Sequence, residues 1–118
     1  MSLVFVYGTL KRGGSNHTHL ARQAFVGEAR TAPGFRLYQL DGYPGMVALA
    51  GDHAGVTGEV WSVDAACLAQ LDLLEGVAEG LYRREPVPLL APFAGRSVEA
   101  YLYARSVAGR KDLGPTWA

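Results

Sequence analysis

The sequence predicts an α+β fold in which a curled, mostly antiparallel sheet or small barrel carries one or two helices across it. Three observations lead to this prediction. Short β-like runs alternate with turn residues over most of the chain, only one segment has a clear helical pattern, and 118 residues suit one domain with its own core. We therefore treat residues 1–118 as a single domain.

The first half of the chain predicts one strand, a short helix and four further strands. Leu3–Tyr7 is apolar throughout and stops at Gly8, which is typical of a buried strand. Asn16–Ala24 is expected to form a short helix, with Ser15 or Asn16 as its N-terminal cap. The strands that follow lie between turn residues and are predicted at Phe25–Ala29, Phe35–Leu40, Met46–Ala50 and Val56–Val63. The last of these has apolar residues on both faces, so we expect it to be covered on both sides.

The second half predicts the clearest helix of the chain and two more strands. The helix runs from Asp64 to about Glu75, because Asp64 is a good N-cap and Gly76 a good C-terminal stop. The strands are predicted at Arg83–Leu90, whose prolines indicate an edge or a bulge, and at Ser97–Ala104. The tail after about residue 106 is polar and contains Gly and Pro, so we expect it to be loose.

Composition excludes several classes of protein. The chain is 49% hydrophobic and 19% charged, and its 11 basic residues balance 11 acidic ones, which gives no reason to expect nucleic acid or a membrane surface as a partner. A single cysteine allows no internal disulfide, and neither a membrane-spanning run nor a signal peptide is visible. We therefore expect a cytoplasmic protein.

Glu75 is the most informative residue of the predicted helix. At helical spacing it shares a face with Leu68 and Leu71, at the end of an apolar stripe. Burial and the helix dipole both disfavour a charged carboxylate there, which would raise its pKa and suit it to proton transfer near neutral pH. The alternative is that Glu75 lies at a frayed helix end and reaches solvent.

The stretch Gly8–Ser15 follows the first strand and has the glycine spacing of a phosphate-binding P-loop. Gly14, however, stands where a P-loop needs its lysine, which argues against nucleotide binding. A chain that turns at Tyr7-Gly8-Thr9 can instead direct successive backbone N–H groups outward and hold a carboxylate or oxyanion. A simple turn is the alternative.

The sequence gives little support for a metal site or for a serine or cysteine nucleophile. His17, His19 and His53 have no Cys or carboxylate spaced to complete a zinc site, so we expect surface histidines and no metal. No serine occupies a Gly-x-Ser-x-Gly elbow. Cys67 lies in the apolar stripe of the helix, which favours a packing role.

Four segments in order carry a resemblance to a known family. They are VFVYGTLKRGGSNH at 4–17, GEVWSVD at 58–64, LDLLEG at 71–76 and LYRREPV at 81–87. These segments resemble the gamma-glutamyl cyclotransferase-like superfamily, and the closest branch is gamma-glutamylamine cyclotransferase. The likeness runs from residue 3 to about residue 105. Its specific part is the combination of Tyr-Gly-Thr-Leu at the end of a first strand with a distant Glu at the end of a helix.

The resemblance implies a small, mostly antiparallel β-barrel with flanking helices and a cavity at one mouth. It implies that Tyr7, Gly8, Thr9 and Leu10 hold the glutamyl end of a small-molecule substrate, largely through main-chain groups, and that Glu75 is the acid/base. In the implied reaction the substrate's α-amine attacks its own γ-carbonyl, 5-oxoproline forms, and an amine or amino acid leaves. No metal, cofactor or covalent enzyme intermediate is implied.

Five further positions match the branch less specifically. Tyr43 and Pro44 match a Tyr-Pro turn, Tyr82 and Arg84 match a Tyr-x-Arg, and Tyr103 matches a tyrosine in the last strand. Each fits packing as well as substrate contact. The chain is shorter around residues 50–57 than the animal form and ends earlier, so the likeness supports the glutamyl half of the substrate better than the leaving group. A different class stays open, a non-catalytic protein that binds a small carboxylate metabolite in the same cavity; the presence of Glu75 disfavours it.

Overall fold

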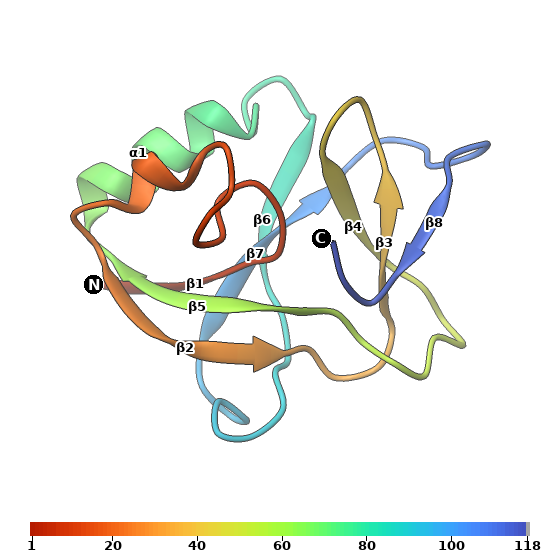
Figure 1. The fold of residues 1–118 in the computed structure, drawn as a ribbon, viewed down its shortest axis with the longest axis horizontal. Helices are drawn as coiled ribbons and strands as arrows, with labels where there is room; N and C mark the ends of the chain where they lie inside the picture. The colour runs from red at the N-terminus through yellow and green to blue at the C-terminus, as the bar shows by residue number, and fades with distance from the viewer. Residues whose placement is uncertain (118) are drawn as a thin grey trace.

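One curled sheet of eight strands forms the body of the molecule, in a computed structural model that describes residues 1–117 (Figure 1). The strands are β1 (Ser2–Val6), β2 (Ala24–Arg30), β3 (Phe35–Gln39), β4 (Pro44–Ala48), β5 (Thr57–Val63), β6 (Tyr82–Pro86), β7 (Val98–Tyr103) and β8 (Asp112–Gly114). A one-turn 3-10 helix, η1 (His17–Leu20), and an α-helix, α1 (Ala65–Leu74), complete the fold. The predicted α+β class is confirmed.

The strand order is β2-β5-β1-β7-β4-β3-β8, with β6 paired to β7 off this path. Only the β1–β7 and β4–β7 pairs are parallel among the described residues, so the sheet is mostly antiparallel. Strand β7 meets β1 through Val98–Ala100 and β4 through Leu102 alone. The two halves of the sheet therefore diverge beyond β7 and curl into an open half-barrel.

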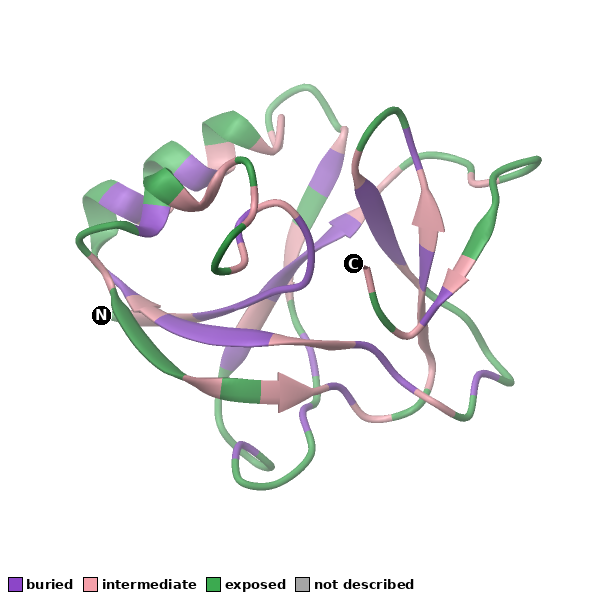
Figure 2. Ribbon diagram, viewed as in Figure 1, coloured by how far each residue is buried: buried purple, intermediate pink, exposed green. Residues whose placement is uncertain are grey.

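Two apolar cores lie on opposite faces of this sheet. Figure 2 shows buried stretches in β1 and β5, two strands that contribute to both cores. Phe5 and Tyr7 of the first strand segment enter the core inside the curl, whereas Val4 and Val6 enter the core between the sheet and the helices. Successive residues of a strand point to opposite faces, so a strand buried on both sides carries apolar residues on both of its faces. This explains the uninterrupted apolar run at the start of the chain, and the same two-sided burial is found in β5.

Helix α1 begins and ends as its sequence predicts. The Asp64 carboxylate accepts a hydrogen bond of 2.7 Å from the Cys67 N–H at the N-terminus. At the other end Gly76 has φ +64°, and the N–H groups of Gly76 and Val77 donate to the carbonyls of Leu73 and Asp72. This is a Schellman motif, which only a residue without a Cβ adopts easily. Glu75 is consequently the last residue before the chain turns away.

The predicted helix at Asn16–Ala24 is wrong beyond its first turn. Only His17–Leu20 is helical, and β2 already begins at Ala24. Leu20 is fully buried, but Ala21 and Ala24 are exposed, so the segment has no apolar face that could stabilise a longer helix. The Asn16 side chain makes no capping bond and donates to Thr9 instead.

The prediction of a loose tail is also wrong. Strand β8 pairs with β3, the Pro115 carbonyl accepts from the Thr57 N–H at 2.8 Å, and Trp117 packs partly buried against the inner core. The tail is polar because only some of its residues, such as Leu113 and Trp117, pack against the core, and most of the others are exposed. Strand β6 lies at an edge as expected, but it ends at Pro86, four residues before the predicted end. No helix in the described part of the chain is long and apolar enough to cross a membrane.

Candidate active site

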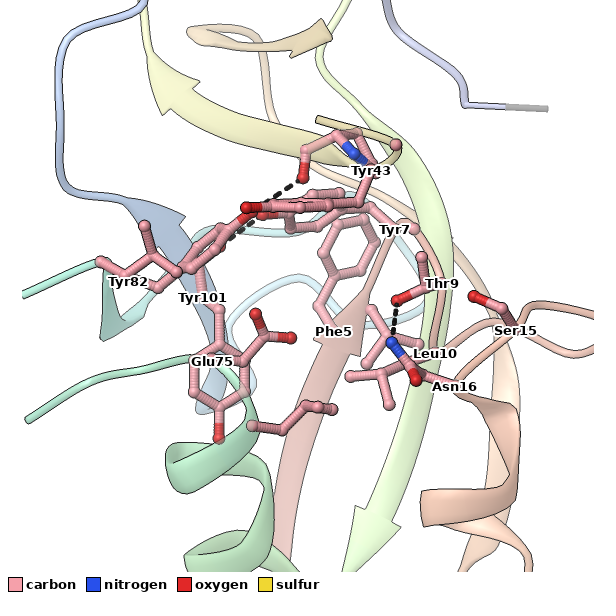
Figure 3. A pocket seen from close by; sticks show the side chains of 16 residues that line it. Phe5, Tyr7, Thr9, Leu10, Ser15, Asn16, Tyr43, Glu75, Tyr82 and Tyr101 are labelled. Atoms are coloured by element: carbon pink, nitrogen blue, oxygen red, sulfur yellow. Dashed lines mark hydrogen bonds between the residues drawn. The ribbon is translucent and has the colours of Figure 1, made fainter. Parts of the chain in front are cut away.

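A cavity of about 330 Å³ opens where the end of β1, the loop after it, the start of β4 and the end of α1 meet (Figure 3). Eight of the ten residues predicted for the site line it: Tyr7, Gly8, Thr9, Leu10, Tyr43, Pro44, Glu75 and Tyr82. They come from four separate parts of the chain. The cavity therefore exists only because the sheet curls β4 and the end of α1 toward the tip of β1.

The carboxyl of Glu75 points into this cavity (Figure 3). It makes no hydrogen bond or ion pair with any residue of 1–117. Every fully buried side-chain oxygen in that range has a hydrogen-bond partner, so the Glu75 oxygens are not fully buried. They are therefore accessible to a molecule in the cavity. Burial of the carboxyl raises its pKa from 4.5 to about 7. Glu75 is thus poised to take up or release a proton near neutral pH.

The loop that follows β1 forms the opposite wall. The Lys11 N–H donates to the Gly8 carbonyl at 3.1 Å, and Asn16 donates to Thr9 twice, from its N–H to the carbonyl at 2.9 Å and from Nδ2 to the hydroxyl at 3.0 Å. Within residues 1–117 the N–H groups of Gly8, Thr9 and Leu10 donate to no other group. A Cβ on Gly8 would lie 2.7 Å from the Pro44 ring, so only glycine allows this wall to approach β4.

Three tyrosines of the cavity have engaged hydroxyls. The Tyr7 hydroxyl donates to the Tyr101 carbonyl at 2.6 Å and accepts from the Met46 N–H at 3.1 Å. The Tyr82 hydroxyl donates to the Pro44 carbonyl at 3.0 Å. Burial raises the pKa of Tyr7, Tyr82 and Tyr101 above the ordinary value, so these phenols stay protonated and brace the wall at neutral pH.

Arg84 and Tyr103 are the two predicted residues that do not line the cavity. Arg84 binds Asp72 of α1 through Nε at 2.9 Å and Glu99 of β7 at 2.7 Å. Tyr103 packs edge-on against Tyr82 with 5.4 Å between ring centroids. Both lie behind the wall, where they hold α1 and the tyrosines in place. Of the two alternatives that the sequence leaves open for these residues, their position in this structure matches packing.

Sequence reasoning does not single out Asn16 and Tyr101, which also line the cavity. The sequence favours Asn16 as a helix cap, although its place eight residues after Gly8 allows it to close the loop. Tyr101 belongs to the strand predicted at Ser97–Ala104, and the sequence assigns it no role in a site. Its hydroxyl donates to Asp72 at 2.7 Å, so the residue links the cavity to the Arg84 ion pair.

The residues considered for other chemistry lie elsewhere. Among residues 1–117 no group of three His, Cys, Asp or Glu side chains could hold a metal ion. His17 Nδ1 lies 3.0 Å from the Leu10 carbonyl oxygen. Cys67 is buried in the core beneath α1, and burial raises the pKa of its thiol.

A curled half-barrel whose cavity contains one partnerless carboxyl and a turn with free amides is typical of a small-molecule enzyme site. The family model described as gamma-glutamyl cyclotransferase, AIG2-like matches residues 4–117. The chain belongs to this family and is an enzyme of the gamma-glutamyl cyclotransferase class.

Individual relatives agree with this membership. The chain is 49% identical to a Vibrio cholerae protein provisionally named a gamma-glutamylcyclotransferase, over 95% of this chain and 92% of that protein. It is 35% identical to human gamma-glutamylaminecyclotransferase, over 100% of this chain and 84% of the human protein. The crystal structure of an AIG2-like protein from Mus musculus has a TM-score of 0.74 and 32% identity, over 90% of this chain and 78% of the mouse chain.

Proposed function

We propose that the protein converts γ-glutamyl amines, or related γ-glutamyl compounds, into 5-oxoproline and a free amine without a cofactor. Glu75 is the acid/base of this reaction. The observation that carries the proposal is its carboxyl, which faces the cavity without a partner and has a pKa of about 7. The family and its named relatives support the same chemistry.

Glu75 is the one group of the described cavity lining that suits proton exchange at neutral pH. The neighbouring phenols of Tyr7, Tyr82 and Tyr101 have raised pKa values, and the remaining lining residues are apolar, amide or hydroxyl groups. A carboxyl with a pKa close to the working pH is both a competent base and a competent acid. Such a group contributes roughly 10²–10⁴-fold to a rate.

The reaction needs each of these parts in turn. The ionised Glu75 takes a proton from the substrate's α-ammonium, and the amine so formed attacks the γ-carbonyl carbon of the same molecule. A C–N bond closes the five-membered ring while the carbonyl oxygen becomes an oxyanion. Protonated Glu75 then gives its proton to the γ-nitrogen, the oxyanion collapses to the lactam carbonyl, and the old C–N bond breaks. The second proton of the ring nitrogen passes to the regenerated Glu75 carboxylate and from there to the departing amine, which leaves as its ammonium. Because nucleophile and electrophile belong to one molecule, no serine or cysteine nucleophile is required.

The loop after β1 supplies the other half of the proposed site. The free N–H groups of Gly8, Thr9 and Leu10 can hold the α-carboxylate of the glutamyl head, and one of them can stabilise the oxyanion. Holding the head bends the substrate so that its α-amine meets its γ-carbonyl. Orientation of this kind contributes several kcal/mol, up to about 7–11 kcal/mol in ideal cases.

The test is release of 5-oxoproline from a panel of γ-glutamyl amines and γ-glutamyl dipeptides, measured by chromatography for the wild type and for Glu75→Gln. We expect turnover by the wild type and a loss of roughly 10²–10⁴-fold in the variant, with substrate binding retained in calorimetry. Binding without any product in the wild type would instead identify a non-catalytic metabolite-binding protein. Release of glutamate in place of 5-oxoproline would identify simple amide hydrolysis.

A further inference from the structure

A second carboxylate, Glu59 of β5, is buried opposite Val6 of β1 and is not among the residues that line the cavity. Glu59 and Asp52 are the two carboxylate residues buried within residues 1–117, with 7% and 8% of their surface exposed. A buried carboxylate is costly unless N–H groups surround it. The hydrogen-bond partners of Glu59 therefore indicate its structural role.

Three N–H groups converge on Glu59. The Arg12 backbone N–H and guanidinium Nε donate to Oε1 and Oε2 at 3.1 and 3.0 Å, and the Trp61 indole donates to Oε1 at 3.1 Å. Burial alone would raise the pKa of Glu59, but these donors outweigh it and keep the pKa below the ordinary value. Glu59 is therefore ionised at neutral pH and grips the chain at Arg12 through both main chain and side chain.

Arg12 lies in the same loop as the free amides of Gly8, Thr9 and Leu10. The guanidinium also stacks on Phe25, 3.9 Å from the ring centroid, which fixes it against β2. Trp61 packs against His17 at 5.2 Å between ring centroids, and His17 Nδ1 reaches the Leu10 carbonyl oxygen. One carboxylate thus organises contacts to the far end of the loop and to the helical turn that follows it.

We propose that Glu59 is a positioning residue that holds the loop after β1 from outside, so that the N–H groups of Gly8, Thr9 and Leu10 face the cavity. It touches no substrate and acts through Arg12 and Trp61. The consequence for catalysis depends on the function proposed above, because the loop is there the holder of the glutamyl head. The consequence for the loop itself does not depend on that function.

Glu59→Gln and Asp52→Asn form a matched pair for the test. Each substitution replaces a buried carboxylate by an amide of equal size. The new NH2 group cannot accept a hydrogen bond, so it lies against N–H donors that have lost their acceptor. Asp52 accepts from the N–H groups of Gly34, Ala54 and Gly55 and from Arg36, none of which lines the cavity. Both variants lose stability by the same mechanism, but only one of them touches the substrate loop.

Amide hydrogen exchange measured by NMR reports directly on the stability of the hydrogen bonds that close the loop. In Glu59→Gln we expect the protection of the Lys11, Gly14 and Asn16 amides, whose bonds close the loop, to fall at least about tenfold relative to the core. In Asp52→Asn those amides should keep wild-type protection. Equal loop protection in the two variants would overturn the proposal, whether or not the protein releases 5-oxoproline.

Steady-state kinetics supplies the second readout. Where the loop holds the glutamyl head in ground state and transition state alike, Glu59→Gln should raise KM about tenfold or more while the pH dependence of kcat, set by Glu75, stays as in the wild type. Asp52→Asn should leave KM unchanged at a temperature where both variants are folded. An unchanged KM in Glu59→Gln would refute the positioning role. A wild type without activity would refute the proposed function and leave the exchange result to decide the loop.

Discussion

Glu75 should destabilise the folded protein at neutral pH, and its substitution measures by how much. Its pKa is about 7 in the folded protein against an ordinary value of 4.5, an interval of about 2.5. Each pH unit of such an interval corresponds to about 1.36 kcal/mol, so burying the ionised carboxyl costs up to about 3 kcal/mol. Glu75→Gln removes this cost, since glutamine has the size of the protonated acid and no charge.

The sign of the effect follows from proton binding. Between pH 4.5 and about 7 the folded chain holds a proton on Glu75 that the unfolded chain has released, so the stability that Glu75 contributes falls as pH rises through this window. Below pH 4.5 both forms carry a neutral side chain, and Glu75→Gln and wild type should be equally stable. Above about pH 8 the variant should be more stable by up to about 3 kcal/mol.

Urea unfolding followed by tryptophan fluorescence at pH 4, 6 and 8 tests this expectation. Trp61 and Trp117 pack against different cores and report on both sides of the sheet. The contributions of all other titrating groups cancel in the difference between the unfolding free energies of the variant and the wild type. Glu79→Gln, which removes a charge at an exposed position nearby, should change stability by less than about 1 kcal/mol at each pH. A Glu75→Gln difference that does not grow with pH would show that the carboxyl is solvated, and the acid/base assignment would fall with it.

Three further perturbations test the framework around the cavity. Tyr7→Phe removes a buried hydroxyl that bonds two backbone groups at 2.6 and 3.1 Å, so we expect a loss of about 1–3 kcal/mol in urea unfolding; an unchanged midpoint contradicts this. Gly58→Ala places a Cβ 2.3 Å from the Val6 carbonyl oxygen and should prevent folding or destabilise strongly, whereas Gly27→Ala meets only a ring edge at 3.3 Å and should fold. Deleting residues 112–118 removes β8 and the Trp117 contact, so Tm should fall by several degrees. A truncated chain with the same Tm as the full one would show that these contacts do not stabilise the fold, as expected for a loose tail.

The parts of the fold that follow from the sequence share a strong local signal. The two-sided burial of β1 shows directly as an apolar run, and that of β5 as apolar residues on both of its faces. Helix α1 carries an N-cap at Asp64 and a left-handed stop at Gly76. These signals depend only on neighbouring residues. For that reason the sequence by itself places Glu75 at the end of a helix.

The parts that the sequence does not predict depend on distant partners. The tail is held by pairing with β3 and by a bond from the Lys11 ammonium to the Trp117 carbonyl, neither of which has a local signature. For Arg84 the sequence leaves packing and substrate contact equally open, because a Tyr-x-Arg pattern cannot tell which side of a strand faces a cavity. Its actual partners, Asp72 and Glu99, lie 12 and 15 residues away on other elements.

The charges of the cavity make a last prediction about the leaving group. None of the residues that line the cavity, within the described chain, is Lys, Arg or His, and the loop amides offer a place for one carboxylate. A γ-glutamyl amino acid brings a second carboxylate, which would find no cation there and would lie near the Glu75 carboxyl. Like charges placed together in an enclosed site cost several kcal/mol, and each 1.4 kcal/mol is a factor of ten.

γ-Glutamylpentylamine and γ-glutamylnorleucine isolate this effect, because their leaving groups share one alkyl chain and differ by a single carboxylate. If the protein is the proposed cyclotransferase, kcat/KM should be at least about tenfold higher for the pentylamine compound, with the gap narrowing as salt screens the repulsion. Comparable values for the two compounds would mean that a cation outside the lining, such as Arg105 beside the loop before β6, reaches the leaving group. Arg105→Gln would then lower kcat/KM for the norleucine compound alone, which would assign the selectivity to the cavity mouth instead of to its interior.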